Sequence, residues 1–206
     1  MQRLIAFLAL QRRPMPRQQV AEMLWGDATA DHSSACLRST LWRLGVSGVP
    51  VLRPRSRDLD LDGNVTVDVH DLERVAHRLI DGADGNLVDV DYSELLDDVL
   101  PDWRDEWLGV ERERFRQLRM HALEALSMRL QREGRFAQAI DASLAVVSHE
   151  PLRESAQRAL ISAHIREGNL QEAVRQYRSF RDMLSNELGI DPSPLMIELM
   201  RGVNVR

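Results

Sequence analysis

Residues 58–68 read DLDLDGNVTVD, and the first six of these letters match the start of a calcium-binding EF-hand loop. That loop needs a bidentate Glu about eleven residues after its first Asp, where this chain has Val69. Apolar and polar residues instead alternate on both sides of Asp62-Gly63, with Leu59 and Leu61 before it and Val65, Val67 and Val69 after it. Alternation around an Asp-Gly turn predicts a β-hairpin, not a calcium site.

The residues before this hairpin predict three short helices. Apolar residues form one helical face over Leu4–Leu10, a second helix is expected over Arg17–Trp25, and a third from about Ser33 to Gly45. The third has candidate N-caps at Asp31, Ser33 and Ser34 and an apolar seam of Leu37, Leu41 and Leu44. Three helices followed by a hairpin is the order of a winged helix-turn-helix, in which the hairpin is the wing.

Charge is unevenly distributed along a chain whose net charge is −5. Residues 1–57 carry nine Arg and three acidic residues, a net charge of +6, whereas residues 58–111 carry three Arg and seventeen acidic residues, a net of −14. The basic segment is a candidate polyanion-binding surface. For the acidic segment two interpretations stay open: an ordinary solvated surface, or a surface that repels DNA and turns the basic face outward.

The third helix of a winged helix-turn-helix lies in the major groove of DNA. Opposite the apolar seam this helix carries Arg38, Ser39, Trp42 and Arg43, and the segment before the turn repeats arginine at strand spacing as Arg53, Arg55 and Arg57. An arginine fork binds guanine edges or phosphates, so we predict that these seven residues contact DNA. The alternatives are that the arginines are only solvated and that Trp42 packs on the scaffold.

The second half contains a repeat. Residues 122–139 match residues 156–173, and Gly134 and Gly168 are 34 residues apart, which is the tetratricopeptide period. We expect both glycines to be structural, and helices over residues 69–80 and 93–100 to complete the stack. The predicted fold is therefore mainly α, with a winged helix-turn-helix domain over residues 1–68 and an all-α, tetratricopeptide-like domain over residues 69–206.

Composition argues against several other classes of protein. A single cysteine, Cys36, excludes an internal disulfide and indicates a reducing compartment, and no apolar run is long enough to span a membrane, so we expect a cytoplasmic protein with no membrane contact. The chain has no lysine, hence no phosphate-binding P-loop, and its six histidines show no metal-ligand spacing. Paired carboxylates such as Asp97-Asp98 leave an enzyme as a weaker alternative. We expect neither catalysis nor a cofactor.

Several motifs together resemble SARP-type bacterial transcriptional activators, which join an OmpR-type winged helix to a helical bacterial transcriptional activator domain. The resemblance covers nearly the whole chain. The motifs are Leu-Trp-Gly-Asp (24–27), Leu-Arg-Ser-Thr-Leu-Trp-Arg-Leu (37–44), Val-Asp-Val (67–69), Glu-Arg-Glu-Arg-Phe-Arg-Gln-Leu-Arg (111–119), Pro-Leu-Arg-Glu (151–154) and Glu-Leu-Gly-Ile-Asp-Pro-Ser-Pro (187–194).

The resemblance implies promoter binding to double-stranded DNA, often as homodimers, and contacts that recruit RNA polymerase, with the loop at residues 26–32 facing the polymerase. Members usually carry a small N-terminal sheet before the first helix, whereas this sequence starts inside that helix, so the sheet is expected to be missing. We therefore predict a DNA-binding transcriptional activator whose repeat domain dimerises or contacts proteins. The alternative is a helical-repeat scaffold with a winged helix that no longer binds DNA.

Overall fold

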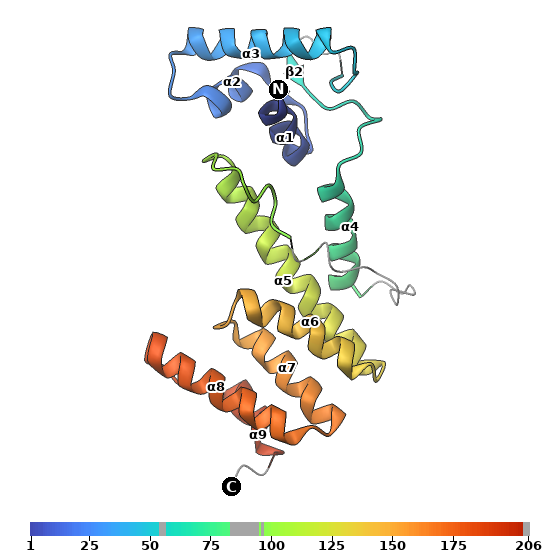
Figure 1. Ribbon diagram of the computed structural model, residues 1–206, viewed down its shortest axis with the longest axis vertical. Coiled ribbons are helices and arrows are strands. Elements are labelled where there is room, and N and C mark those ends of the chain that lie inside the picture. The colour runs from blue at the N-terminus through green and yellow to red at the C-terminus, as the bar shows by residue number, and fades with distance from the viewer. Residues whose placement is uncertain (54–56, 83–94, 96, 204–206) are drawn as a thin grey trace. The chain divides into compact units, whose positions relative to one another are not determined.

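The computed structural model describes residues 1–53, 57–82, 95 and 97–203. The chain is mainly helical, as predicted, and divides into two units (Figure 1). The first unit comprises Met1–Asp71 and Val99–Glu113, and the second comprises Leu72–Asp98 and Arg114–Arg206. Within the described ranges, no helix combines the length and apolar character that a membrane crossing requires.

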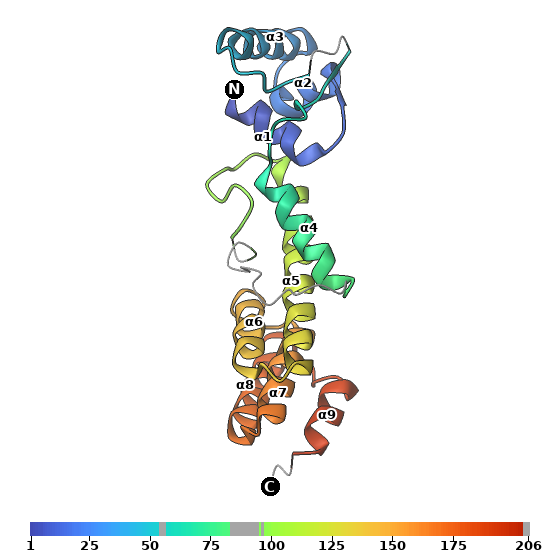
Figure 2. The same cartoon turned by 90° about the vertical axis from the view of Figure 1, so that its right-hand side faces the viewer.

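Three helices form the body of the first unit, where α3 packs on α2 (Figures 1 and 2). The bounds predicted for α2 are confirmed. Apolar side chains from all three helices, including the fully buried Phe7 and Val20, make the core. The elements are α1 (Gln2–Gln11), β1 (Met15–Pro16), α2 (Arg17–Trp25), α3 (Ala30–Val46) and β2 (Asp58–Leu59).

The start of α3 differs from the prediction. The helix begins at Ala30, with Thr29 as its N-cap residue, and not near Ser33. Ser33 is buried, and its hydroxyl donates hydrogen bonds to the carbonyls of Trp25 (3.0 Å) and Thr29 (2.9 Å). These bonds join the end of α2 to the first turn of α3, so this serine is an interior contact and not a cap. The loop between the two helices is correspondingly shorter than expected.

The hairpin predicted around Asp62-Gly63 is wrong. The Asn64 amide donates to the Asp62 carboxylate (3.0 Å), and the chain then enters helix α4 (Asp68–Ile80) instead of returning as a strand. The alternating residues before the turn do pair, but with earlier segments. β2 pairs antiparallel with β1, and Leu61 forms an antiparallel bridge with Leu52.

The segment Val99–Glu113 belongs to the first unit. Trp107 packs edge-on against Phe7, with ring centroids 5.2 Å apart. The Arg112 guanidinium donates to the carbonyls of Val99 (2.9 Å) and Trp103 (2.8 Å), which holds the loop before α5 closed on itself. The helix predicted over residues 93–100 lies partly outside the described residues, and residues 97–100 form no helix.

The second unit contains the predicted helical repeats. In Figures 1 and 2, α6 and α7 lie side by side, as do α7 and α8. Gly134 (φ 76°) and Gly168 (φ 90°) adopt left-handed conformations at the turns, which a residue with a Cβ rarely adopts. Fully buried alanines such as Ala142 and Ala163 allow the helices to approach closely. The helices are α5 (Leu108–Arg132), of which the residues from Arg114 onward belong to this unit, α6 (Phe136–His149), α7 (Glu154–Glu167), α8 (Leu170–Leu188) and α9 (Pro194–Arg201).

Candidate nucleic-acid interface

Helix α3 has one buried and one exposed face. Leu37, Thr40 and Leu44 are buried, and the Thr40 hydroxyl donates to the Cys36 carbonyl (2.9 Å), so its polar group is satisfied within the helix. The predicted site residues all lie on the other side and are exposed: Arg38, Ser39, Trp42 and Arg43. The structure thus brings these four onto one surface, whereas their contact with DNA stays a prediction.

The two arginines of α3 lie exposed on its outer face. Within the described part of the chain neither Arg38 nor Arg43 forms an ion pair. The Arg43 guanidinium lies 3.4 Å from both the carbonyl and the hydroxyl of Ser39, which is long for a hydrogen bond. Both side chains are exposed, so their charge faces solvent and can meet an anionic ligand.

Two grooves flank α3, and both contain Arg17 at the start of α2. The first groove, of about 360 Å³, lies between α2 and α3 and includes Arg38. The second, of about 540 Å³, lies between the end of α3 and the segment that carries Arg53. Sequence reasoning did not assign Arg17 to the site. Its place in the basic segment was the available signal, but only the packing of α2 on α3 brings it beside Leu41 in both grooves.

Of the three later arginines the structure describes Arg53 and Arg57, which do not share one strand face. Arg53 donates its backbone N–H to the Asp60 carbonyl (3.0 Å) across an antiparallel pair, so the chain has reversed direction between these residues. The Arg53 side chain is exposed and lies 3.8 Å from the Asp60 carboxylate. Arg57 is exposed, and its carbonyl accepts a hydrogen bond from the Arg17 amide (3.2 Å). Arg55 lies outside the described residues.

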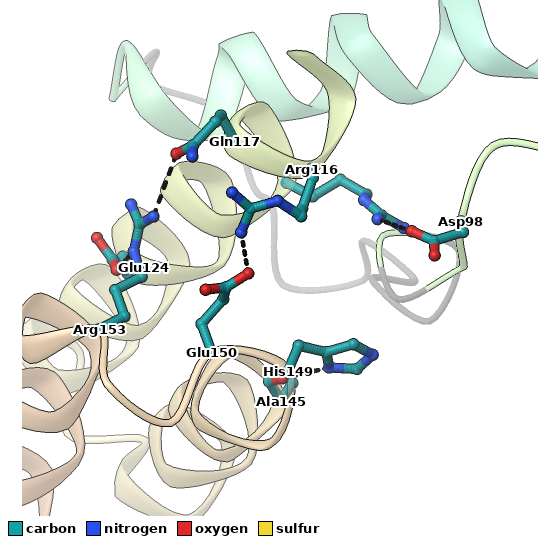
Figure 3. A network of polar contacts seen from close by, with 9 residues as sticks. Asp98, Arg116, Gln117, Glu124, Ala145, His149, Glu150 and Arg153 are labelled. Atoms are coloured by element: carbon teal, nitrogen blue, oxygen red, sulfur yellow. Dashed lines mark hydrogen bonds and ion pairs between the residues drawn. The ribbon is translucent and has the colours of Figure 1, made fainter. Parts of the chain in front are cut away.

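In the second unit the motif residues join helices to one another. Arg153 donates to the Glu124 carboxylate (2.6 Å) and to the Gln117 amide oxygen (3.3 Å), which ties the start of α7 to α5 (Figure 3). Arg116 pairs with Glu150 in the same view. These contacts give the sequence motifs at residues 111–119 and 151–154 a structural role.

The carboxylate of Glu154 connects the motif at residues 151–154 to the motif at residues 187–194. It accepts hydrogen bonds from the backbone N–H of Ser193 (2.9 Å) and from the Ser193 hydroxyl. Ser193 is the N-cap residue of α9, with Pro194 at the first helical position. An anionic acceptor at this point satisfies a helix N-terminus and favours its dipole. The start of α7 therefore positions α9.

Helices α5, α7 and α9 border a groove of about 490 Å³ in the second unit. Two of its apolar side chains are well exposed, Met128 (55%) and Leu195 (64%). Charged residues of both signs, among them Arg158 and Glu198, line it as well. Among the residues that the structure describes, no group of His, Cys, Asp and Glu side chains could hold a metal ion.

Comparison with known proteins identifies relatives of both units. The model of the bacterial transcriptional activator domain matches residues 93–204. The regulatory protein AfsR of Streptomyces coelicolor is 29% identical over 215 residues, which cover 97% of this chain and 21% of that protein. AfsR of Streptomyces griseus is 36% identical over 70 residues, covering 34% of this chain and 7% of that protein.

A solved structure shares the fold. Mycobacterium tuberculosis EmbR, determined in complex with a low-affinity phosphopeptide, superposes with a TM-score of 0.61 at 21% identity, and the superposition covers 96% of this chain and 58% of the EmbR chain.

The present chain spans only 21% of the S. coelicolor AfsR sequence. Since the domain model matches more than half of the chain, the chain belongs to the family of proteins with a bacterial transcriptional activator domain, to which SARP-type proteins belong.

Proposed function

We propose that this chain is a transcriptional activator that binds promoter DNA through the outer face of α3. The observation that carries the proposal is the exposure of Arg38, Ser39, Trp42 and Arg43 on one face of a helix whose other face is buried in the first unit. A helix presented in this way fits the major groove, and two exposed guanidinium groups suit guanine edges and phosphates.

Arg17, Arg53 and Arg57 extend the same basic region around α3. Arg17 and Arg53 border a groove beside α3. Arg57 is exposed, and its carbonyl accepts the hydrogen bond from the Arg17 backbone N–H. We assign these residues to phosphate contacts, which orient a protein on DNA without reading its sequence. The sequence spacing assigns the same role to Arg55. In this proposal the segment that pairs through Leu52 and Leu61 acts as the wing.

The test is fluorescence anisotropy of the 206-residue chain with the DNA upstream of its own gene and with a scrambled duplex, across a series of salt concentrations. Tighter binding of the upstream DNA is expected, with a logarithmic salt slope of about −0.9 for each phosphate neutralised. Equal affinity for both duplexes would exclude sequence-specific reading. Absence of binding to either would contradict the proposed function.

For the repeat domain, proposed to extend over residues 69–206, we assign protein contacts such as dimerisation of the regulator on DNA, while contact with RNA polymerase stays assigned to the segment at residues 26–32. The groove with exposed Met128 and Leu195 supports a protein-binding role for this part of the chain. Sedimentation of the chain with and without bound DNA measures the stoichiometry. A single copy on every specific duplex would contradict the dimer.

The same groove favours a second candidate function, a protein-interaction scaffold without DNA binding. This function predicts no anisotropy change with any duplex, together with binding of one defined partner that is lost in Leu195→Asp. The matched control is Val110→Asp, because Val110 is 76% exposed and lies in the first unit. Specific DNA binding that depends on Arg38 would exclude this second candidate.

A further inference from the structure

The exposed face of α3 carries an apolar strip between its two arginines. At about 100° of rotation per residue, Ala35, Trp42 and Val46 project within roughly 40° of one another. Ala35 is exposed, and the fractional exposures are 70% for Trp42 and 66% for Val46. Arg38 and Arg43 project on either side of this strip, about 140° apart by the same rotation.

An exposed strip of this kind marks an interaction site. Single exposed apolar residues are common on protein surfaces, but a tryptophan with a valine one turn further along is a contiguous patch. Val49, beyond the end of the helix, is also exposed, at 62%. The arginines on both sides favour an anionic partner, so the charge complements DNA better than it complements an apolar protein surface.

The major groove offers an apolar strip one favourable group. Thymine presents its C5 methyl there, whereas guanine, adenine and cytosine present hydrogen-bond donors and acceptors. Covering those polar edges with Trp42 and Val46 would remove them from water without replacing their hydrogen bonds, which is unfavourable. Covering a methyl group removes apolar surface from water and stabilises the complex.

We propose that Trp42, with Val46 beside it, selects thymine methyl groups at base pairs between those contacted by Arg38 and Arg43. This inference rests on the proposed function and adds to it a chemical feature of the operator and the residue that reads it. Burial of one methyl group corresponds to about a fourfold gain in affinity. The expected preference is therefore modest at each base pair and specific to one or two positions.

The experiment uses the duplex that the 206-residue chain enriches from a randomised library. Each thymine is replaced in turn by deoxyuridine, which keeps the base pair and removes only the methyl group. With the unsubstituted protein, replacement of thymine at one or two positions should lower the affinity for the duplex about fourfold. For Trp42→Ala, the same replacement should have no effect at those positions, because the contact has already been removed.

Val46→Ala should reduce the methyl preference in part. Its matched control is Val110→Ala, the same change at a residue that is 76% exposed, and this variant should keep the full preference. Because Trp42 is 70% exposed, Trp42→Ala should unfold at the same temperature as the natural sequence. That check separates a lost contact from a lost fold.

Each remaining outcome is decisive. Specific binding that is unaffected by deoxyuridine at every position overturns this inference and leaves the proposed function intact. A methyl preference that persists in Trp42→Ala also overturns it. Full DNA affinity in Trp42→Ala with reduced binding of purified RNA polymerase assigns the strip to a protein contact instead. Enrichment of no duplex by the natural chain overturns the proposed function and this inference together.

Discussion

The arginines of α3 differ from Arg119 on α5 and from Arg153, the N-cap residue of α7, in what surrounds their guanidinium groups. In the second unit Arg119 is buried and pairs with Asp98, and Arg153 donates to Glu124 at 2.6 Å. On α3, Arg38 and Arg43 are exposed, and no ion pair forms there within the described residues. Arg119 and Arg153 therefore stabilise the fold, whereas the two arginines of α3 face outward, where an anionic ligand can meet them.

The largest effect tests whether the first unit holds α3 without help from the repeats. Trp107→Ala removes the partner of the fully buried Phe7 and should lower the free energy of unfolding of the first unit by about 3–5 kcal/mol. Hydrogen exchange should show loss of protection in α1 and α3 while α7 and α8 stay protected. Trp103→Ala, at a partly exposed tryptophan, is the control. Equal loss in both units would contradict their independence.

A second prediction compares the two kinds of arginine contact directly. Glu124→Ala leaves Arg153 and the Ser155 hydroxyl without their shared acceptor and should cost about 1–3 kcal/mol of stability. Arg38→Ala removes no such contact and should change stability by less than about 0.5 kcal/mol. Urea unfolding measures both. A destabilising Arg38→Ala would show that this side chain supports the fold and would remove the contrast.

A third prediction concerns affinity for DNA, where the arginines of α3 should matter most although they matter little for stability. Arg38→Ala and Arg43→Ala should each weaken binding to the specific duplex by about 1–3 kcal/mol, because each removes a base or phosphate contact. Arg175→Ala is the matched control, since this α8 side chain is 76% exposed and lies in the second unit. Anisotropy titrations give the affinities. Unchanged binding in both α3 variants would sink the assignment of this surface.

The smallest effect concerns the arginines outside α3. Arg57→Ala should weaken all duplexes alike and reduce the logarithmic salt slope by about one, as expected for loss of a phosphate contact. Arg53→Ala should weaken binding and reduce the salt slope less than Arg57→Ala does. The Asp60 carboxylate, 3.8 Å away, already offsets part of the Arg53 charge. Salt titrations with specific and scrambled duplexes measure this. A loss confined to the specific duplex would instead indicate base reading by these residues.

Local pattern was sufficient for much of the fold and for part of the candidate site. The apolar spacing of Leu37, Leu41 and Leu44 identified which face of α3 is inward, and therefore that Arg38 and Trp42 lie outward, because helical periodicity depends only on neighbours in sequence. Gly134 and Gly168 marked turns that require positive φ. Family motifs and repeat spacing predicted two domains, 1–68 and 69–206, and this division stays a prediction.

Pairing between distant segments was not predictable in the same way. Alternation at Leu59 and Leu61 indicates a strand but does not show which segment pairs with it. In the structure Leu59 pairs with Met15 and Leu61 with Leu52, and neither pairs with the valines that follow. Arg55 was predicted from spacing alone and lies outside the described residues. Arg17 was missed because its position beside α3 depends on how α2 packs.

The sequence by itself therefore determined most of the helices and the inward and outward faces of α3, since these depend on residues a few positions apart. It also showed the repeat period and the basic character of the first segment, which can be read directly from the order of residues. Tertiary structure decided which carboxylate each arginine meets: Glu73 for Arg114, at 2.7 Å, and Asp98 for Arg119. It also decided that Val99–Glu113 joins the first unit. Ion pairs and buried aromatic contacts form between side chains that folding brings together, and their separation along the chain carries no local signature.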